Sequence, residues 1–173
     1  MTKIVSAPGI EVTQKNFHQI IIRGDGLEKF NNIIKEKTSI QPPSKNLEIK
    51  HDSNYLFAKN SPDQWSLVLT DKKEHNQITN LVSSINVNED LLASDYSYGQ
   101  VYFEISGKNR NEFLNKLTHF DLRLKKFPAF SMAQTLIAKI DCSIYNLKDK
   151  YIVTCNRSFE DYFKERLKDT ANI

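Results

Sequence analysis

A short pattern occurs twice in this 173-residue chain: an apolar strand-like run, a glycine, and then a segment that carries an aromatic residue about one helical turn in. The first copy is residues 22–30, Ile-Arg-Gly-Asp-Gly-Leu-Glu-Lys-Phe, and the second is residues 105–113, Ile-Ser-Gly-Lys-Asn-Arg-Asn-Glu-Phe. A glycine ends a strand readily because it tolerates conformations that other residues avoid. The repetition predicts an internal duplication of one strand-and-helix plan.

The two halves of the chain continue in the same order. From the spacing of apolar residues, the first half is expected to form a strand at 17–23, a helix from 27, a hairpin around the turn at 60–63 and a helix at 72–85. The second half is expected to form a strand at 100–106, a helix at 109–117, a strand at 133–140, a hairpin at 142–155 and a last helix. In that last helix Ser158 is the expected N-cap, with Asp161 three residues later. The prediction is an α+β fold, a two-layer sandwich with an internal β-α-β-β-α duplication.

Chain length and composition set the expected domain organisation. Hydrophobic residues make up 39% of the chain and charged residues 26%, as is typical of a globular protein. Residues 1–15 contain Pro8-Gly9 and no clear periodicity, so we expect an extended N-terminal arm there. Residues 16–173 are expected to form a single α+β domain.

The charge balance and the apolar runs exclude some classes of partner. Lys and Arg number 24 and Asp and Glu number 21, a net charge of +3 that is too small to indicate a nucleic-acid surface. The apolar runs have the length of strands and are too short to span a membrane. No secretion signal is recognised, so we expect a soluble, cytoplasmic protein whose two cysteines, Cys142 and Cys155, are reduced although they lie on adjacent predicted strands.

No constellation of residues in the sequence indicates chemistry. Four histidines lie far from one another and from other ligand types, so no metal site is expected: His18, His51, His75 and His119. No serine or cysteine has a nearby His and Asp that would activate it as a nucleophile, and no glycine-rich phosphate loop is present. We therefore predict no catalytic, cofactor-binding or metal-binding residue in this chain.

Three charged residues in the second half can nevertheless be interpreted in two ways. Asp121 and Arg123 would point to the same side of an extended segment, where they form either an anchor for a partner or an ion pair that fixes a loop. Arg157, beside the start of the last helix, either pairs with a carboxylate across a subunit boundary or makes a local structural hydrogen bond.

Several segments, in their order along the chain, resemble the gamma subunit of heterotetrameric sarcosine oxidase, which is related to the folate-binding domain of aminomethyltransferases. Residues 61–68 are similar to the Gly-Pro-Asp-Glu-Trp-Leu-Leu segment of that family, and residues 95–101 to its Asp-Val-Ser-His-Gly strand. The resemblance continues with Ile-Ser-Gly at 105–107, Phe-Asp-Leu at 120–122, Phe-Pro at 127–128, Ala-Gln-Thr at 133–135 and Arg-Ser-Phe at 157–159, followed by Tyr162. It covers roughly residues 55–168.

The resemblance implies a non-catalytic subunit that stabilises a large alpha subunit, in a complex that also contains beta and delta subunits. Such a complex demethylates sarcosine oxidatively and passes the one-carbon unit to tetrahydrofolate. Its FAD, FMN, NAD, zinc and tetrahydrofolate are implied for the partner subunits and not for this chain. The expected subunit interface includes Asp121, Arg123, Phe127 and Arg157.

Two alternatives remain open from the sequence. One is the small subunit of a related complex that acts on dimethylglycine, N-methylglutamate or another N-methyl compound. The other is a free-standing folate-binding protein, which would need a carboxylate for the pterin and basic groups for the glutamate tail; Asp95 and Arg123 are the candidates.

Overall fold

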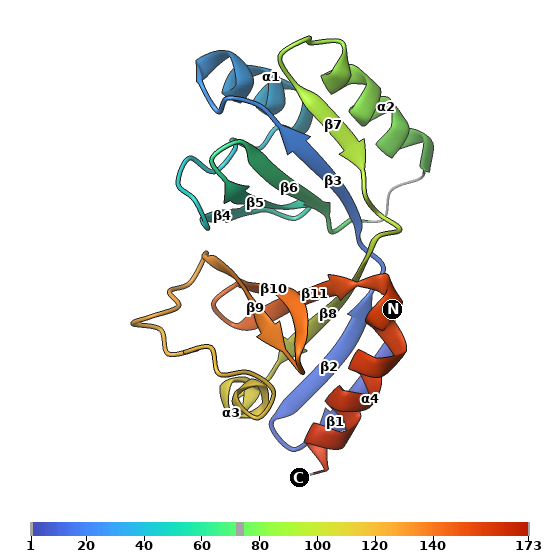
Figure 1. Cartoon of the computed structure of the whole chain (residues 1–173), viewed down its shortest axis with the longest axis vertical. Coiled ribbons are helices and arrows are strands. Elements are labelled where there is room, and N and C mark those ends of the chain that lie inside the picture. The colour runs from blue at the N-terminus through green and yellow to red at the C-terminus, as the bar shows by residue number, and fades with distance from the viewer. Residues whose placement is uncertain (1, 72–74, 173) are drawn as a thin grey trace. The chain divides into compact units, whose positions relative to one another are not determined.

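The computed structural model describes residues 2–71 and 75–172 (Figure 1). The chain forms two compact units. The central unit comprises residues 17–97, and the terminal unit combines residues 2–16 with residues 98–172. No helix among the described residues is long and apolar enough to cross a membrane.

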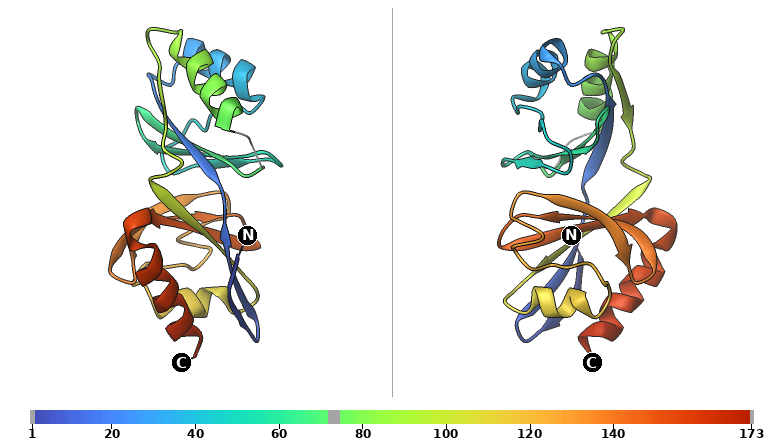
Figure 2. Two further views of the ribbon diagram at one scale, coloured as in Figure 1. Left: turned by 90° about the vertical axis from the view of Figure 1, so that its right-hand side faces the viewer. Right: turned by 60° about the vertical axis from the view of Figure 1, so that its left-hand side comes forward.

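The central unit is a five-stranded antiparallel sheet with the order β4-β5-β6-β3-β7. Its strands are β3 (His18–Arg23), β4 (Ile49–His51), β5 (Tyr55–Ser61), β6 (Gln64–Leu69) and β7 (Leu92–Asp95). Helices α1 (Glu28–Thr38) and α2 (His75–Asn86) lie on one face of the sheet (Figure 2). The start of the predicted helix at residues 72–74 lies outside the described residues.

A hydrophobic core joins these helices to the sheet. Phe30 and Ile34 from α1 and Ile78 and Ile85 from α2 are fully buried with the strand residues of one core cluster. Trp65, the one tryptophan of the chain, stacks at 4.4 Å from Phe30 and donates its indole N–H to the carbonyl of Pro43 at 2.9 Å. Burying both ring and N–H in this way satisfies the polar atom and retains the apolar contact.

The terminal unit is a six-stranded antiparallel sheet with the order β1-β2-β8-β11-β10-β9. Its strands are β1 (Thr2–Ala7), β2 (Ile10–Lys15), β8 (Gln100–Ser106), β9 (Met132–Ile137), β10 (Ile140–Asn146) and β11 (Lys150–Asn156). Helices α3 (Arg110–Asn115) and α4 (Glu160–Ala171) lie on one face (Figure 2), and the 3-10 turn η1 (Arg157–Phe159) precedes α4. The core of this unit includes Phe113 and Leu114 of α3 and Phe163 and Leu167 of α4.

The two units share one topology. In the central unit the chain runs β3-α1-β4-β5-β6-α2, and in the terminal unit it runs β8-α3-β9-β10-β11-α4, with corresponding strands in the same order across each sheet. The two glycines of the sequence repeat occupy equivalent places, directly after β3 and after β8. Each unit is therefore a sheet covered by two helices, and the α+β class expected from the sequence is confirmed, with β4 added to the predicted order.

In each sheet, one strand is followed directly along the chain by the first strand of the other unit's repeated pattern. β2 runs almost directly into β3 but pairs with β8, whereas β7 precedes β8 but pairs with β3. The strand that leads into each unit is thus hydrogen-bonded within the sheet of the other one.

Three local features differ from the sequence-based expectation. Residues 2–15 are not a separate arm, because β1 and β2 form a hairpin inside the six-stranded sheet. The predicted strand at 133–140 is broken at Ala138 and Lys139, whose φ values of 53° and 69° make a tight turn into β10. Ser158 is not the N-cap of α4: it lies inside η1, which is capped by the Asn156 side chain accepting the backbone N–H of Ser158 at 2.9 Å, and the N-cap position of α4 is Phe159.

Candidate functional site

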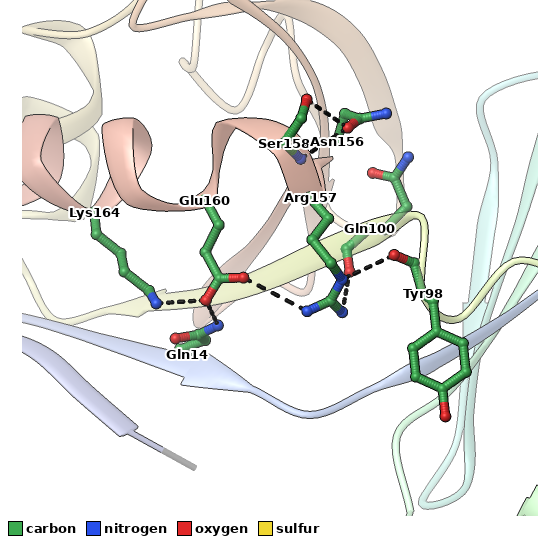
Figure 3. Close-up of polar contacts among 8 residues, drawn as sticks. All are labelled: Gln14, Tyr98, Gln100, Asn156, Arg157, Ser158, Glu160 and Lys164. Atoms are coloured by element: carbon green, nitrogen blue, oxygen red, sulfur yellow. Dashed lines mark hydrogen bonds and ion pairs between the residues drawn. The ribbon is translucent and has the colours of Figure 1, made fainter.

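Arg157 lies at the centre of a polar network in the terminal unit (Figure 3). Its Nε donates to the carbonyl of Tyr98 at 2.8 Å, and its second terminal nitrogen donates to the carbonyl of Gln100 at 2.9 Å. The guanidinium also approaches Glu160 at 3.5 Å. Most of its donors are thus used inside the unit, where they attach the start of β8 to the start of α4.

Glu160 extends this network to the N-terminal hairpin. It accepts hydrogen bonds from Lys164 and, at 2.9 Å, from the amide of Gln14 on β2 (Figure 3). These hydrogen bonds, together with the nearby Arg157, lower the pKa of the Glu160 carboxyl. Of the two interpretations of Arg157, the structure contains the local hydrogen bonds. Contact of Arg157 with a partner stays a prediction.

Asp121 and Arg123 form an ion pair within the loop between α3 and β9. The Arg123 Nε donates to Asp121 Oδ1 at 2.8 Å, and the Arg123 backbone N–H donates to the same oxygen at 3.1 Å. These hydrogen bonds lower the pKa of Asp121 to about 2. The pair fixes the loop, yet the Arg123 side chain remains 80% exposed and is available for a further contact.

Phe127 differs from the other three interface candidates. Its side chain is 2% exposed, lies edge-on to Phe120 and stacks on Tyr151 in the core of the terminal unit. A side chain packed in this way is not available to a partner. The prediction of an interface role for Phe127 is therefore corrected, since its side chain belongs to the core.

The two residues named for a folate site are both engaged. The Asp95 carboxylate accepts from the backbone N–H of Ser97 at 2.9 Å and from its hydroxyl at 2.5 Å, so it caps a turn of the central unit. Arg123 is held by Asp121 in the terminal unit. Asp95 belongs to the central unit and Arg123 to the terminal unit.

A cavity of about 550 Å3 lies in the terminal unit between the end of α3, the turn from β9 to β10 and the exposed face of α4. Its lining includes four basic side chains and no carboxylate: Lys116, His119, Lys139 and Arg166. Sequence reasoning missed it because the lining combines the segment 115–119 with Lys139 and Arg166, which lie far along the chain from it and from each other.

The polar groups at the base of this cavity already have partners. The Thr118 hydroxyl donates to the carbonyl of Leu136 at 2.7 Å, and the Tyr162 hydroxyl donates to the carbonyl of Ala138 at 3.0 Å. The Ala138 N–H in turn donates to the carbonyl of Leu117 at 2.8 Å. These bonds fasten the β9–β10 turn to α3 and α4, so the cavity has a fixed floor and an exposed basic rim.

Neither a metal site nor an exposed thiol is found among the described residues. No group of three or more His, Cys, Asp or Glu side chains in residues 2–71 and 75–172 could hold a metal ion. Cys142 and Cys155 are free and buried, directly opposite each other on β10 and β11.

The fold and these surfaces define a small α+β protein built from two related units. A model of the sarcosine oxidase gamma subunit family matches residues 44–172, which is well over half of the chain. The chain therefore belongs to the sarcosine oxidase gamma subunit family.

Solved structures share this fold. A chain of heterotetrameric sarcosine oxidase from Corynebacterium sp. U-96, in complex with pyrrole 2-carboxylate, superposes with a TM-score of 0.83 at 16% identity, over 98% of this chain and 87% of that one. Aminomethyltransferase T of the glycine cleavage system from Bartonella henselae superposes with a TM-score of 0.63 at 10% identity, over 95% of this chain. This chain spans 46% of that aminomethyltransferase. No curated protein matches this sequence.

Proposed function

We propose that this chain is the gamma subunit of a heterotetrameric sarcosine oxidase-type complex and that it stabilises the large alpha subunit. The observation that carries the proposal is the combination of the family match with a fold shared over 98% of this chain and 87% of a chain of such an enzyme. Agreement over nearly the whole length of both chains suits an equivalent subunit better than a shared domain.

The proposed role is structural, and the catalytic groups are assigned to the partner subunits. In the terminal unit the charged groups most constrained by hydrogen bonds, Arg157, Glu160 and Asp121, have partners within the unit itself. The cofactors of the proposed complex, FAD, FMN, NAD, zinc and tetrahydrofolate, would accordingly be held by the alpha, beta and delta subunits. The reaction of the complex would be oxidative demethylation of sarcosine, with dimethylglycine or N-methylglutamate as the alternative substrate.

Co-expression of this chain with the products of neighbouring genes tests the proposal. Affinity purification through a tag on this chain, followed by mass determination, should yield an assembly of four different chains with a flavin spectrum. Assay of that assembly against a panel of N-methyl amines then identifies the substrate. Recovery of this chain alone as a folded monomer, after co-expression with those genes, would contradict the proposed role.

A further inference from the structure

The structure assigns a partner-docking surface to the terminal unit, around the cavity that β9, the β9–β10 turn and α4 form. We call it the Leu136 surface and define it by Lys116, Leu136, Lys139, Phe159, Tyr162 and Arg166. We propose that it receives an acidic segment of a larger partner subunit, with an apolar side chain of that segment against Leu136. This inference rests on the proposed function.

The surface combines exposed apolar side chains with cations. Leu136 is 55% exposed and lies between two hollows: it lines the basic cavity together with Tyr162, and it lines a second groove of the terminal unit together with Phe159. Phe159, the last residue of η1, and Tyr162, in the first turn of α4, are 44% and 43% exposed. Aromatic anchors next to arginine are the residues that dominate binding energy in protein interfaces.

The positive charge of the Leu136 surface favours an acidic partner segment. Lys116, Lys139 and Arg166 line the cavity and no carboxylate does. Arg166 pairs with Asp169 at 3.2 Å, whereas Lys116 and Lys139 have no ion-pair partner among the described residues. The cations of the cavity outnumber the carboxylates that pair with them, so the cavity is complementary to an acidic surface, and such complementarity raises the rate of association and disfavours like-charged partners.

Two other occupants fit the surface less well. A second copy of this chain in a symmetric dimer would place the same lysines opposite each other, which opposes association. A small anion is disfavoured because Lys116, Lys139 and Arg166 are all exposed, and the buried polar groups of the floor are already hydrogen-bonded. An added β-strand is also disfavoured here, since Thr118 already occupies the carbonyl of Leu136 at this end of the edge strand.

The charge part of the proposal is tested by reversing the two unpaired lysines in the full chain, co-expressed with its partner subunits. Lys116→Glu with Lys139→Asp is the test variant, since aspartate tolerates the positive φ of residue 139. Lys108→Glu with Lys168→Glu is the matched control, because both lysines are exposed in the same unit and outside the cavity lining. We expect the test variant to associate with its partner about tenfold more slowly than the wild type, and its association rate to lose most of its dependence on salt concentration. The control variant should associate at the wild-type rate.

The apolar part is tested by Leu136→Ser against Leu92→Ser. Both leucines lie on edge strands, and they are 55% and 56% exposed. We expect Leu136→Ser to dissociate about tenfold faster from the assembly and Leu92→Ser to behave as the wild type.

The outcomes separate this inference from the proposed function. Association of the test variants at wild-type rates, while the wild type assembles normally, overturns the docking surface and leaves the subunit role intact. Failure of the wild type to assemble with any partner overturns both. If inorganic phosphate raises the melting temperature of the wild type but not of the lysine variant, and assembly is unaffected, the cations belong to a small-anion site and the docking proposal is overturned.

Discussion

Cys142 on β10 and Cys155 on β11 are register partners, directly opposite each other in adjacent antiparallel strands, and both thiols are free and buried. A hydrogen bond with Cys155 and burial raise the pKa of the Cys142 thiol well above its ordinary value of 9.0. The thiolate is the nucleophile in alkylation and in disulfide formation. Because the raised pKa keeps the Cys142 thiol protonated, the two thiols remain unreactive although they face each other.

We therefore expect Cys142 to react with iodoacetamide at pH 8 at least about tenfold more slowly in the folded chain than in the urea-unfolded chain. Mass spectrometry of digests taken during the reaction measures both rates. Equal rates in the two states, or an intact mass that shows loss of two hydrogens by disulfide formation, would contradict the buried-thiol interpretation.

Asp121 should titrate far below an ordinary aspartate. The hydrogen bonds from Arg123 lower its pKa from 3.8 to about 2 in the folded chain, so the stabilisation that the pair provides is present above pH 3.8 and is lost as the pH falls through about 2. A carboxyl-detected NMR titration at low salt measures this value. In Arg123→Gln the midpoint should move back toward 3.8, and an unchanged midpoint in that variant would show that the pair does not form in solution.

Glu104 connects three adjacent strands of the terminal unit. It pairs with Lys15 on β2 at 3.2 Å and with Lys150 on β11 at 2.8 Å, and all three side chains are partly buried. Burial alone would raise the pKa of Glu104, but the hydrogen bonds from Lys150 and Lys15 outweigh it and lower the pKa.

Substituting Glu104→Gln should thus reduce the free energy of unfolding by about 2 kcal/mol, because two partly buried cations lose their counter-charge. Urea unfolding monitored by circular dichroism measures the loss. Glu11→Gln is the control: its pair with Lys3 is about half exposed on both sides, and its removal should cost less than about 0.5 kcal/mol. Equal effects of the two substitutions would refute the special role of Glu104.

Lys139 occupies a position that favours glycine. Its φ of 69° lies in the left-handed region, in a turn that contains no glycine, asparagine or proline. Lys139→Gly should raise the free energy of unfolding by roughly 0.5 kcal/mol, since relief of the steric cost exceeds the added entropy of the unfolded chain.

The same substitution should weaken association with the partner subunit, because it removes one cation of the Leu136 surface. Thermal unfolding of the isolated chain and binding to the co-purified partner measure the two effects. Lys108→Gly, at a residue without a positive φ, should not raise the free energy of unfolding and should leave association with the partner subunit unchanged. Loss of stability together with association in Lys139→Gly would indicate a merely structural role for Lys139.

The sequence reveals the duplication because its marks are local. A glycine after an apolar strand and an aromatic one turn into the helix can be recognised within nine residues, and both copies of this pattern are found where the structure places β3-α1 and β8-α3. The N-terminal hairpin is a local pairing around Pro8-Gly9, but its place in the sheet is missed because the strand that pairs with β2, residues 100–106, lies far away along the chain. The turn at Ala138 and Lys139 is missed because it lacks the residue types that usually mark such turns.

The candidate surfaces show the same limit. Asp121 and Arg123 are two residues apart, so their pairing could be expected from sequence, and the ion pair is present. The sequence also indicates Arg157, but its partners Tyr98 and Gln100 lie far away along the chain and could not be predicted from it. The basic cavity is visible only in three dimensions, because Lys116, Lys139 and Arg166 come from three different elements.

The exchange of strands between the two units has a consequence for biosynthesis. The central unit is one continuous segment, and its last strand, β7, is synthesised before β8. β2 is made well before β8 but has no sheet to join until β8 has been made, and β11 and α4 follow later still. The hairpin of β1 and β2 thus has no neighbouring strand in its sheet while residues 16–99 are being made, and it reaches its native neighbour β8 only after the whole central unit has been synthesised.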